Sequence, residues 1–69
     1  MIRMRLKAVL AEKNMSMSRL SRLSDISFST ISRIINDEHY SPTLNTLERI
    51  AKALNVSVSE LYEEIKDSD

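Results

Sequence analysis

The sequence contains no cysteine, no glycine and no tryptophan, and it has a single histidine among its 69 residues. Without cysteine, neither a disulfide nor a thiolate zinc site can support the fold, although a domain this small is only marginally stable. Oligomerisation is the remaining common source of added stability. Because no carboxylate pair has a structural reason to face His39, we expect no enzymatic activity, no metal and no cofactor.

Long apolar segments are also missing. No apolar run approaches the roughly 20 residues of a membrane span, and no signal peptide is visible. The expectation is therefore one soluble, cytoplasmic domain, residues 1–69, without a membrane partner.

The net charge is zero, but it is unevenly distributed. Residues 1–35 carry seven basic and two acidic groups, and residues 36–69 carry three basic and eight acidic groups. The first half is thus at +5 and the second at −5. This asymmetry is typical of a polyanion-binding half beside an acidic half, and equally of a solvated surface with uneven charge.

Five short helical patterns follow one another, with no alternating strand pattern, so the sequence predicts an all-α fold. The first helix covers roughly residues 2–13. The others begin at helix-capping residues or at a proline: Ser16, Ser27, Pro42-Thr43 and Ser57, the last forming a capping box with Glu60. Apolar residues at helical spacing should face the core: Ile2, Leu6, Val9, Leu10, Leu20, Leu23, Ile31, Ile34, Ile35, Leu44, Leu47, Ile50, Ala51, Leu54, Val58, Leu61 and Ile65.

Without glycine, the helix ends need other residues that tolerate a left-handed backbone. Asn and Asp are the next best choice, and they stand where the pattern breaks: Asn14, Asp25, Asn36-Asp37 and Asn55. Periodicity and helix-ending residues therefore indicate the same boundaries.

The connection between the second and third helices is short. Only Ser24, Asp25 and Ile26 separate two helices that both bury apolar residues, and so short a turn forces a steep crossing. The spacing is typical of a helix-turn-helix, and also of an ordinary corner between two helices.

Two longer segments, "MSMSRLSRLSDISFSTISRIIND" (15–37) and "SPTLNTLERIAKALNVSVSELY" (41–62), resemble the Cro and phage-repressor-like (XRE-type) helix-turn-helix family. The resemblance implies a compact, five-helix, lambda-repressor-like domain with the helix-turn-helix at the second and third helices. It further implies a prokaryotic or phage protein of the nucleoid that binds double-stranded DNA, commonly as a dimer.

The resemblance makes the third helix the recognition helix and assigns base reading to Phe28, Ser29, Thr30, Ser32 and Arg33. The Arg33 guanidinium can bond both O6 and N7 of guanine, although an exposed arginine can also contact phosphate or solvent alone. Ser29 and Ser32 can donate or accept, so they fit several base edges.

Phe28 has two interpretations. It lies about 60° from the centre of the apolar stripe of its helix, which allows it to pack on the flank of the domain. Helical side chains also lean toward the N-terminus, so its ring should project past the helix end and could pack on a thymine methyl. We favour the second interpretation.

Six residues are candidate phosphate contacts. Ser16 and Asn36 match family positions that usually touch phosphate. Arg19 and His39 are either phosphate contacts or solvated surface, and Tyr40 either bonds phosphate or covers the dimer junction. Met17 stands where the family usually has glutamine, so a contact there must come from backbone N–H groups.

Another departure concerns Leu10 and Ile35. Many family members pair an arginine in the first helix with a glutamate late in the third, and these two apolar residues occupy those places. We therefore expect Leu10 and Ile35 to touch in the core, which leaves no charge unpaired.

A dimer interface is predicted after the third helix. The acidic second half would repel a like surface, so the contact should centre on its apolar residues. These are the Tyr40–Leu44 loop and Leu44, Val58, Tyr62 and Ile65, although Tyr62 can also be a simple surface residue.

The sequence thus predicts a DNA-binding transcriptional regulator, most simply a dimeric repressor that occupies a palindromic operator. The alternative is a protein-interaction module, such as the DNA-binding antitoxin of a toxin–antitoxin pair.

Overall fold

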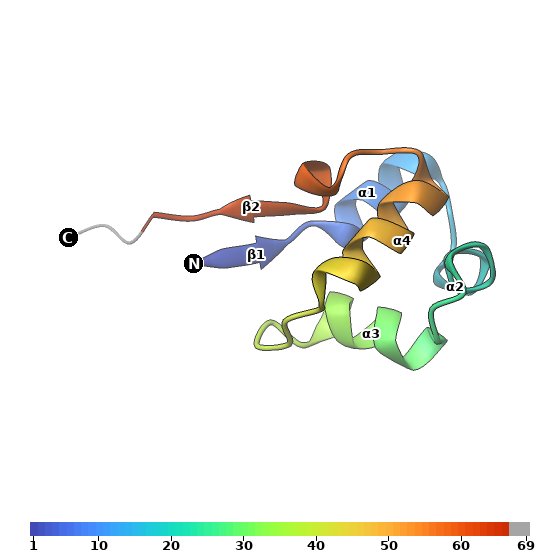
Figure 1. The fold of residues 1–69 in the computed structure, drawn as a ribbon, viewed down its shortest axis with the longest axis horizontal. Coiled ribbons are helices and arrows are strands. Elements are labelled where there is room, and N and C mark those ends of the chain that lie inside the picture. The colour runs from blue at the N-terminus through green and yellow to red at the C-terminus, as the bar shows by residue number, and fades with distance from the viewer. Residues whose placement is uncertain (67–69) are drawn as a thin grey trace.

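The computed structural model describes residues 1–66. In this part of the chain, four α-helices pack together and a two-stranded ribbon projects from them to one side (Figure 1). The elements follow in the order β1 (Ile2–Met4), α1 (Leu6–Lys13), α2 (Met17–Ser24), α3 (Phe28–Asn36), α4 (Leu44–Leu54), a 3₁₀ helix (Val58–Leu61) and β2 (Tyr62–Glu64). None of these helices combines the length and the apolar character that crossing a membrane requires.

The prediction of an all-α, five-helix fold is therefore right for the four α-helices and wrong for both ends of the domain. β1 and β2 pair antiparallel, with Ile2 opposite Glu64 and Met4 opposite Tyr62. Main-chain hydrogen bonds extend the pairing at both ends, from Arg5 N to Leu61 O and from Ile65 N to Met1 O, each 2.7 Å. The ribbon forms because the two ends of the chain meet and satisfy each other's backbone groups.

Two predicted helix starts are corrected by this pairing. The first helix begins at Leu6 rather than at Ile2, because residues 2–4 are extended in β1. The capping box of Ser57 and Glu60 does not form: Glu60 N donates to the main-chain oxygen of Ser57, and the Ser57 hydroxyl lies 3.0 Å from that of Ser59. The chain there makes one 3₁₀ turn and becomes β2, so Val58, Leu61 and Ile65 do not form a helical face.

The other predicted helix starts are confirmed. The side-chain oxygens of Ser16, Ser27 and Thr43 accept hydrogen bonds from main-chain N–H groups three residues later, at 3.1, 3.2 and 3.2 Å. Each bond satisfies one of the N–H groups that the first turn of a helix leaves without a partner.

Ser27→Ala is expected to lower the free energy of unfolding by about 1 kcal/mol, because α3 loses its side-chain cap. Chemical denaturation would measure the change. Ser18→Ala in α2 is the matched control, since the described residues give Ser18 no side-chain hydrogen bond and alanine is the better helix former. Equal stability of the two variants would contradict the importance of the cap.

The predicted left-handed helix ends are right at three positions of four. Asn14, Asp25 and Asn55 have φ of 53°, 58° and 57°. The pair Asn36-Asp37 departs from the prediction: Asn36 is helical, and Asp37 has φ −110° and ψ 100°. Asp37 instead leads into a tight turn, in which its carboxylate accepts a hydrogen bond from His39 N at 3.0 Å.

The core is built from apolar residues of all four α-helices, the α2–α3 turn and the 3₁₀ helix. Its buried members are Leu6, Val9, Leu10, Leu20, Ile26, Ile31, Ile34, Leu47, Ile50, Ala51, Leu54 and Leu61. Three residues predicted to face inward are more than half exposed: Ile2 and Leu44 are 53% and 66% exposed, and Leu23 is 52% exposed. Ile35 is half-buried and packs against the core.

Candidate nucleic-acid interface

The α2–α3 connection is a short, well-bonded turn. Asp25 takes the left-handed conformation, Ile26 is buried, and Ser27 caps α3. The hydroxyl of Ser21 donates to the carbonyl oxygen of Ile26 at 2.6 Å, and that of Ser24 donates to the carbonyl oxygen of Leu20 at 2.7 Å. The first of these bonds ties α2 to the turn before α3, and the second lies within α2. The arrangement is that of a helix-turn-helix.

The turn is also joined to α4. Arg49 Nη2 lies 3.3 Å from Asp25 Oδ2, and α2 packs on α4 beneath this pair. Because the Asp25 side chain is almost fully exposed, the pair adds little to stability.

One side of α3 is left open by the packing. Ile31 and Ile34 point into the core, whereas Ser29, Arg33 and Asn36 are exposed, and Ser32 lies between them half-buried. α3 lies along one edge of the domain, where the other elements leave its outer side uncovered (Figure 1). Of the predicted base-reading residues, Ser29, Ser32 and Arg33 therefore share this accessible helix face.

Hydrogen bonds differentiate the hydroxyl groups on this face. Asn36 Nδ2 donates to Ser32 Oγ at 3.1 Å, so the Ser32 hydroxyl hydrogen remains available to donate. Thr30 is half-buried, and its hydroxyl oxygen accepts from Ser27 Oγ at 2.8 Å within the cap of α3. Ser32 is thus the better placed of the two to approach a base.

Phe28 begins α3 and is 49% exposed. Among the described residues, it does not belong to the apolar side chains that pack against the core. An exposed ring at the first turn of α3 is what a contact with a thymine methyl would need.

Arg33 has an aromatic neighbour that the sequence did not predict. Its guanidinium carbon lies 5.1 Å from the centroid of the Tyr40 ring, which comes from the loop between α3 and α4. Within the described residues, Arg33 has no acidic partner, so its charge is not neutralised by an ion pair. In the sequence, the only indication of this pair is that Arg33 and Tyr40 stand seven residues apart.

The candidate phosphate contacts lie on both sides of α3. Ser16 and Arg19 are exposed at the start of α2, and Asn36 is exposed at the end of α3. Met17 is half-buried and packs against the core, so only its backbone N–H can serve as a phosphate donor. Its side chain has an apolar role.

His39 lies in an acidic loop. Its Nε2 is 3.9 Å from Glu38 Oε1, and its main-chain N–H donates to the carboxylate of Asp37. Two neighbouring carboxylates make this loop a less favourable place for a phosphate than the start of α2.

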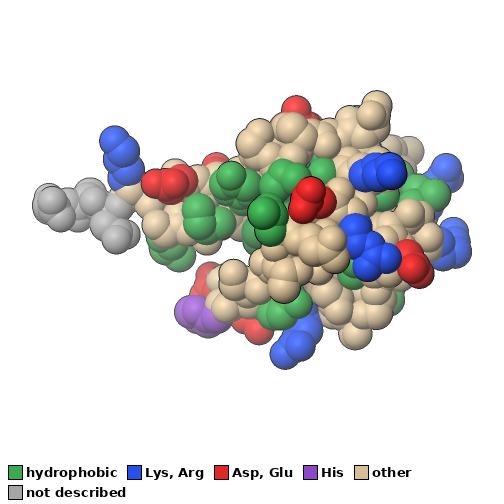
Figure 2. Space-filling view, viewed as in Figure 1, with side chains coloured by type: hydrophobic (Ala, Val, Ile, Leu, Met, Phe, Trp, Pro, Cys, Tyr) green, Lys and Arg blue, Asp and Glu red, His purple; other side chains and the backbone are tan. Residues whose placement is uncertain are grey.

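The basic residues before α1 have intramolecular partners. Arg3 Nη1 lies 3.5 Å from Glu63 Oε1 across the ribbon, and Arg5 Nη2 lies 3.7 Å from Glu12 Oε1. In the view of Figure 2, most lysine and arginine side chains gather over the helical end of the domain, away from the ribbon. The charge available to a polyanion is therefore concentrated on the helices.

The predicted dimer residues do not form one surface. Leu44 and Tyr62 line a shallow groove together with Ile2, Met4 and Pro42. Figure 2 shows hydrophobic side chains gathered over the ribbon and the adjoining helices. Val58 is half-buried and packs against the core. Ile65 follows β2 three residues after Tyr62, which places it on the opposite face of the ribbon by strand alternation. Ile2 and Met4 also line this groove and are not among the predicted dimer residues. Their alternation with Arg3 was the available sequence signal.

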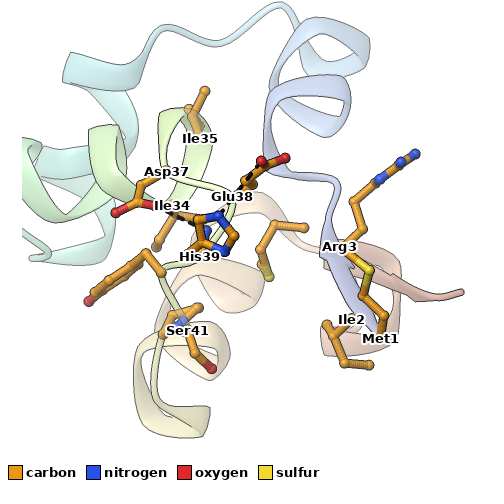
Figure 3. A pocket seen from close by; sticks show the side chains of 12 residues that line it. Met1, Ile2, Arg3, Ile34, Ile35, Asp37, Glu38, His39 and Ser41 are labelled. Atoms are coloured by element: carbon orange, nitrogen blue, oxygen red, sulfur yellow. Dashed lines mark hydrogen bonds and ion pairs between the residues drawn. The ribbon is translucent and has the colours of Figure 1, made fainter.

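A second hollow lies between β1 and the α3–α4 loop. Figure 3 shows Met1, Ile2 and Arg3 on one side of it and the loop with Asp37, Glu38, His39 and Ser41 on the other. It shares Ile2, Met4, Ser41 and Pro42 with the first groove, so the apolar face of the ribbon and the loop form a continuous, uneven surface.

Comparison with known proteins identifies the domain. Residues 5–67 match the family model of the Cro/C1-type HTH DNA-binding domain. A comparison with curated protein sequences gives no match. The match covers the four α-helices, the 3₁₀ helix and β2, and includes the turn and the open face of α3. The chain therefore belongs to the family of Cro/C1-type helix-turn-helix DNA-binding domains, in agreement with the resemblance seen in its sequence.

Proposed function

We propose that the protein is a small dimeric repressor that acts by occupying a palindromic operator. The observation that carries this proposal is the open face of α3, on which Arg33 and Ser32 have hydrogen-bond donors free for bases. The family match supports DNA binding. It gives no support to the alternative of a toxin-binding module.

In this proposal, α3 enters the major groove and Phe28, Ser29, Thr30, Ser32 and Arg33 read bases. Contacts to the phosphates come from Ser16, Arg19 and Asn36 and from the backbone N–H of Met17. The start of α2 fits this role, since its first N–H groups carry partial positive charge.

The proposed dimer uses the apolar face of the ribbon with Leu44. The ribbon and the C-terminal end of α3 point toward the same side of the domain (Figure 1). A second copy on that side would bring the two recognition helices toward successive major grooves, about 34 Å apart. Leu44 and Tyr62 are the centre of this surface, together with Ile2 and Met4.

Selection of bound sites from random duplexes tests the proposal. The expected result is two inverted half-sites with centres about 10 base pairs apart, and an affinity that falls steeply as salt rises. Single, unpaired sites would contradict the dimeric arrangement, and binding that ignores sequence would contradict base reading.

Arg33→Ala should relax the base preference at one position per half-site. The expected cost is about 1–3 kcal/mol on the preferred sequence, with little change on a duplex already altered at that position. Titrations of both duplexes at one salt concentration measure it. Equal weakening on the two would instead identify Arg33 as a phosphate contact.

A further inference from the structure

The pair formed by Arg33 and Tyr40 joins the recognition helix to the loop that follows it. The distance of 5.1 Å between the guanidinium carbon and the ring centroid lies within the range of about 6 Å for attraction between a cation and an aromatic face. Arg33 is exposed, whereas Tyr40 is half-buried and packs against the core. The ring is therefore the fixed member of the pair, and the arginine side chain is the one that it restrains.

The backbone explains why the ring returns to this place. Asp37 N donates to the carbonyl oxygen of Arg33 at 2.9 Å, and Tyr40 N donates to the carbonyl oxygen of Asp37 at 3.0 Å. His39 N donates to the carboxylate of Asp37 at 3.0 Å. These three bonds form a compact turn that begins at Arg33 itself and brings the Tyr40 ring beside the Arg33 side chain; Figure 3 shows the loop with Asp37 and His39.

An aromatic face leaves the donors of arginine free. The guanidinium group is planar and carries its N–H donors along its edge, whereas attraction to a ring uses the face. An arginine held in this way can still donate to O6 and N7 of guanine. The restraint also reduces the number of side-chain conformations that must be lost on binding.

We propose that Tyr40 is a positioning residue, which holds Arg33 in a conformation ready to read a base. This rests on the proposed function, in which Arg33 is the base contact. Positioning of Arg33 requires the Tyr40 ring and does not require its hydroxyl, whereas a phosphate contact by Tyr40 would require the hydroxyl. The two roles therefore predict opposite results for Tyr40→Phe.

The test compares Tyr40→Leu with the matched control Tyr40→Phe. Each variant is titrated with the preferred duplex and with a duplex changed at the one base pair where Arg33→Ala relaxes the preference. For Tyr40→Leu, discrimination between the duplexes should fall about two- to five-fold, which corresponds to the loss of one exposed cation–π contact. Tyr40→Phe should keep the discrimination of the parent.

The pairing itself can be measured without DNA. Protons of the Arg33 side chain that lie over an aromatic ring have NMR chemical shifts displaced by the ring current. The displacement should persist in Tyr40→Phe and disappear in Tyr40→Leu. Its absence from the parent protein would overturn the proposal.

The titrations can overturn it in three further ways. If Tyr40→Phe loses as much affinity as Tyr40→Leu, and on both duplexes alike, the hydroxyl contacts phosphate and the ring does not position Arg33. If Arg33→Ala relaxes no position, the base-reading assignment of the proposed function fails, and this inference with it. Full discrimination by Tyr40→Leu, with an Arg33-dependent preference intact, would overturn the role of Tyr40 alone.

Discussion

Leu10→Arg is expected to lower the free energy of unfolding by about 3–5 kcal/mol, because it places a charge without a partner in the core. Leu10 is 5% exposed, and α1 packs against α3. Domains of this size are marginally stable, so the loss would leave much of the protein unfolded at room temperature. Chemical denaturation followed by circular dichroism would measure it.

The second substitution, Ile35→Glu, should restore part of that loss. Ile35 is half-buried and packs against the core, and it stands where related proteins usually carry the glutamate of an arginine–glutamate pair. If Leu10 and Ile35 are neighbours, the double variant should be more stable than the sum of the single losses by about 0.5–3 kcal/mol. Ile35→Gln is the control, since it is polar but carries no charge to pair with arginine. Purely additive losses in the double variant would refute the contact.

The four α-helices were predictable because their signals are local. A capping hydroxyl, an apolar residue every three or four positions and an Asn or Asp at the end all lie within one helix. Asn14, Asp25 and Asn55 are left-handed as predicted, since no glycine is present to take these positions. The prediction of a left-handed backbone at Asp37 is wrong, because the loop after α3 closes through side-chain and main-chain hydrogen bonds to residue 37. The pattern of Asn and Asp at helix ends does not describe such a loop.

The ribbon was not predictable in the same way. β1 and β2 have three residues each, and their pairing joins positions about 60 residues apart. Three residues are too few to distinguish a strand period from a helical one. The sequence pattern therefore predicts Ile2 on the first helix and Tyr62 and Ile65 on a fifth. The prediction that Leu23 faces the core is wrong for a different reason. Leu20 and Ser24 are one helical turn apart and face the core, and Leu23 lies about 80° from the direction midway between them.

The candidate site shows the same division. The open face of α3 follows from its apolar stripe, because residues on the side of the helix opposite Ile31 and Ile34 must face outward. The Arg33–Tyr40 pair depends on the turn between α3 and α4. Asp37 is a residue type that favours such a turn, but it does not indicate where the Tyr40 ring will lie. The intramolecular pairing of Arg3 with Glu63 likewise follows from the ribbon, and it removes a basic residue from the set that faces DNA.

The ribbon also changes the reason for expecting Tyr62 at a dimer interface. Tyr62 lies opposite Met4 in the ribbon, and Ile2, two residues from Met4, shares that face. Together with Pro42 and Leu44, they line one groove in which Ile2 and Leu44 are more than half exposed. Exposure of these apolar side chains to water is unfavourable. A second copy related by a two-fold axis would cover the groove of each subunit at once.

Tyr62→Asp should therefore weaken the dimer and lower operator affinity by about tenfold or more, because the second half-site would no longer be bound intramolecularly. The new carboxylate would lie in the groove beside Glu64, where it meets like charge and apolar surface. Since Tyr62 is only half-buried, the monomer should keep its fold, which circular dichroism would verify. Tyr62→Phe is the matched control: it keeps the ring and should dimerise like the parent. Sedimentation velocity over a range of concentrations measures dimerisation, and titration at fixed salt measures affinity. A Tyr62→Asp protein that dimerises as well as Tyr62→Phe would exclude this face of the ribbon and place the interface elsewhere.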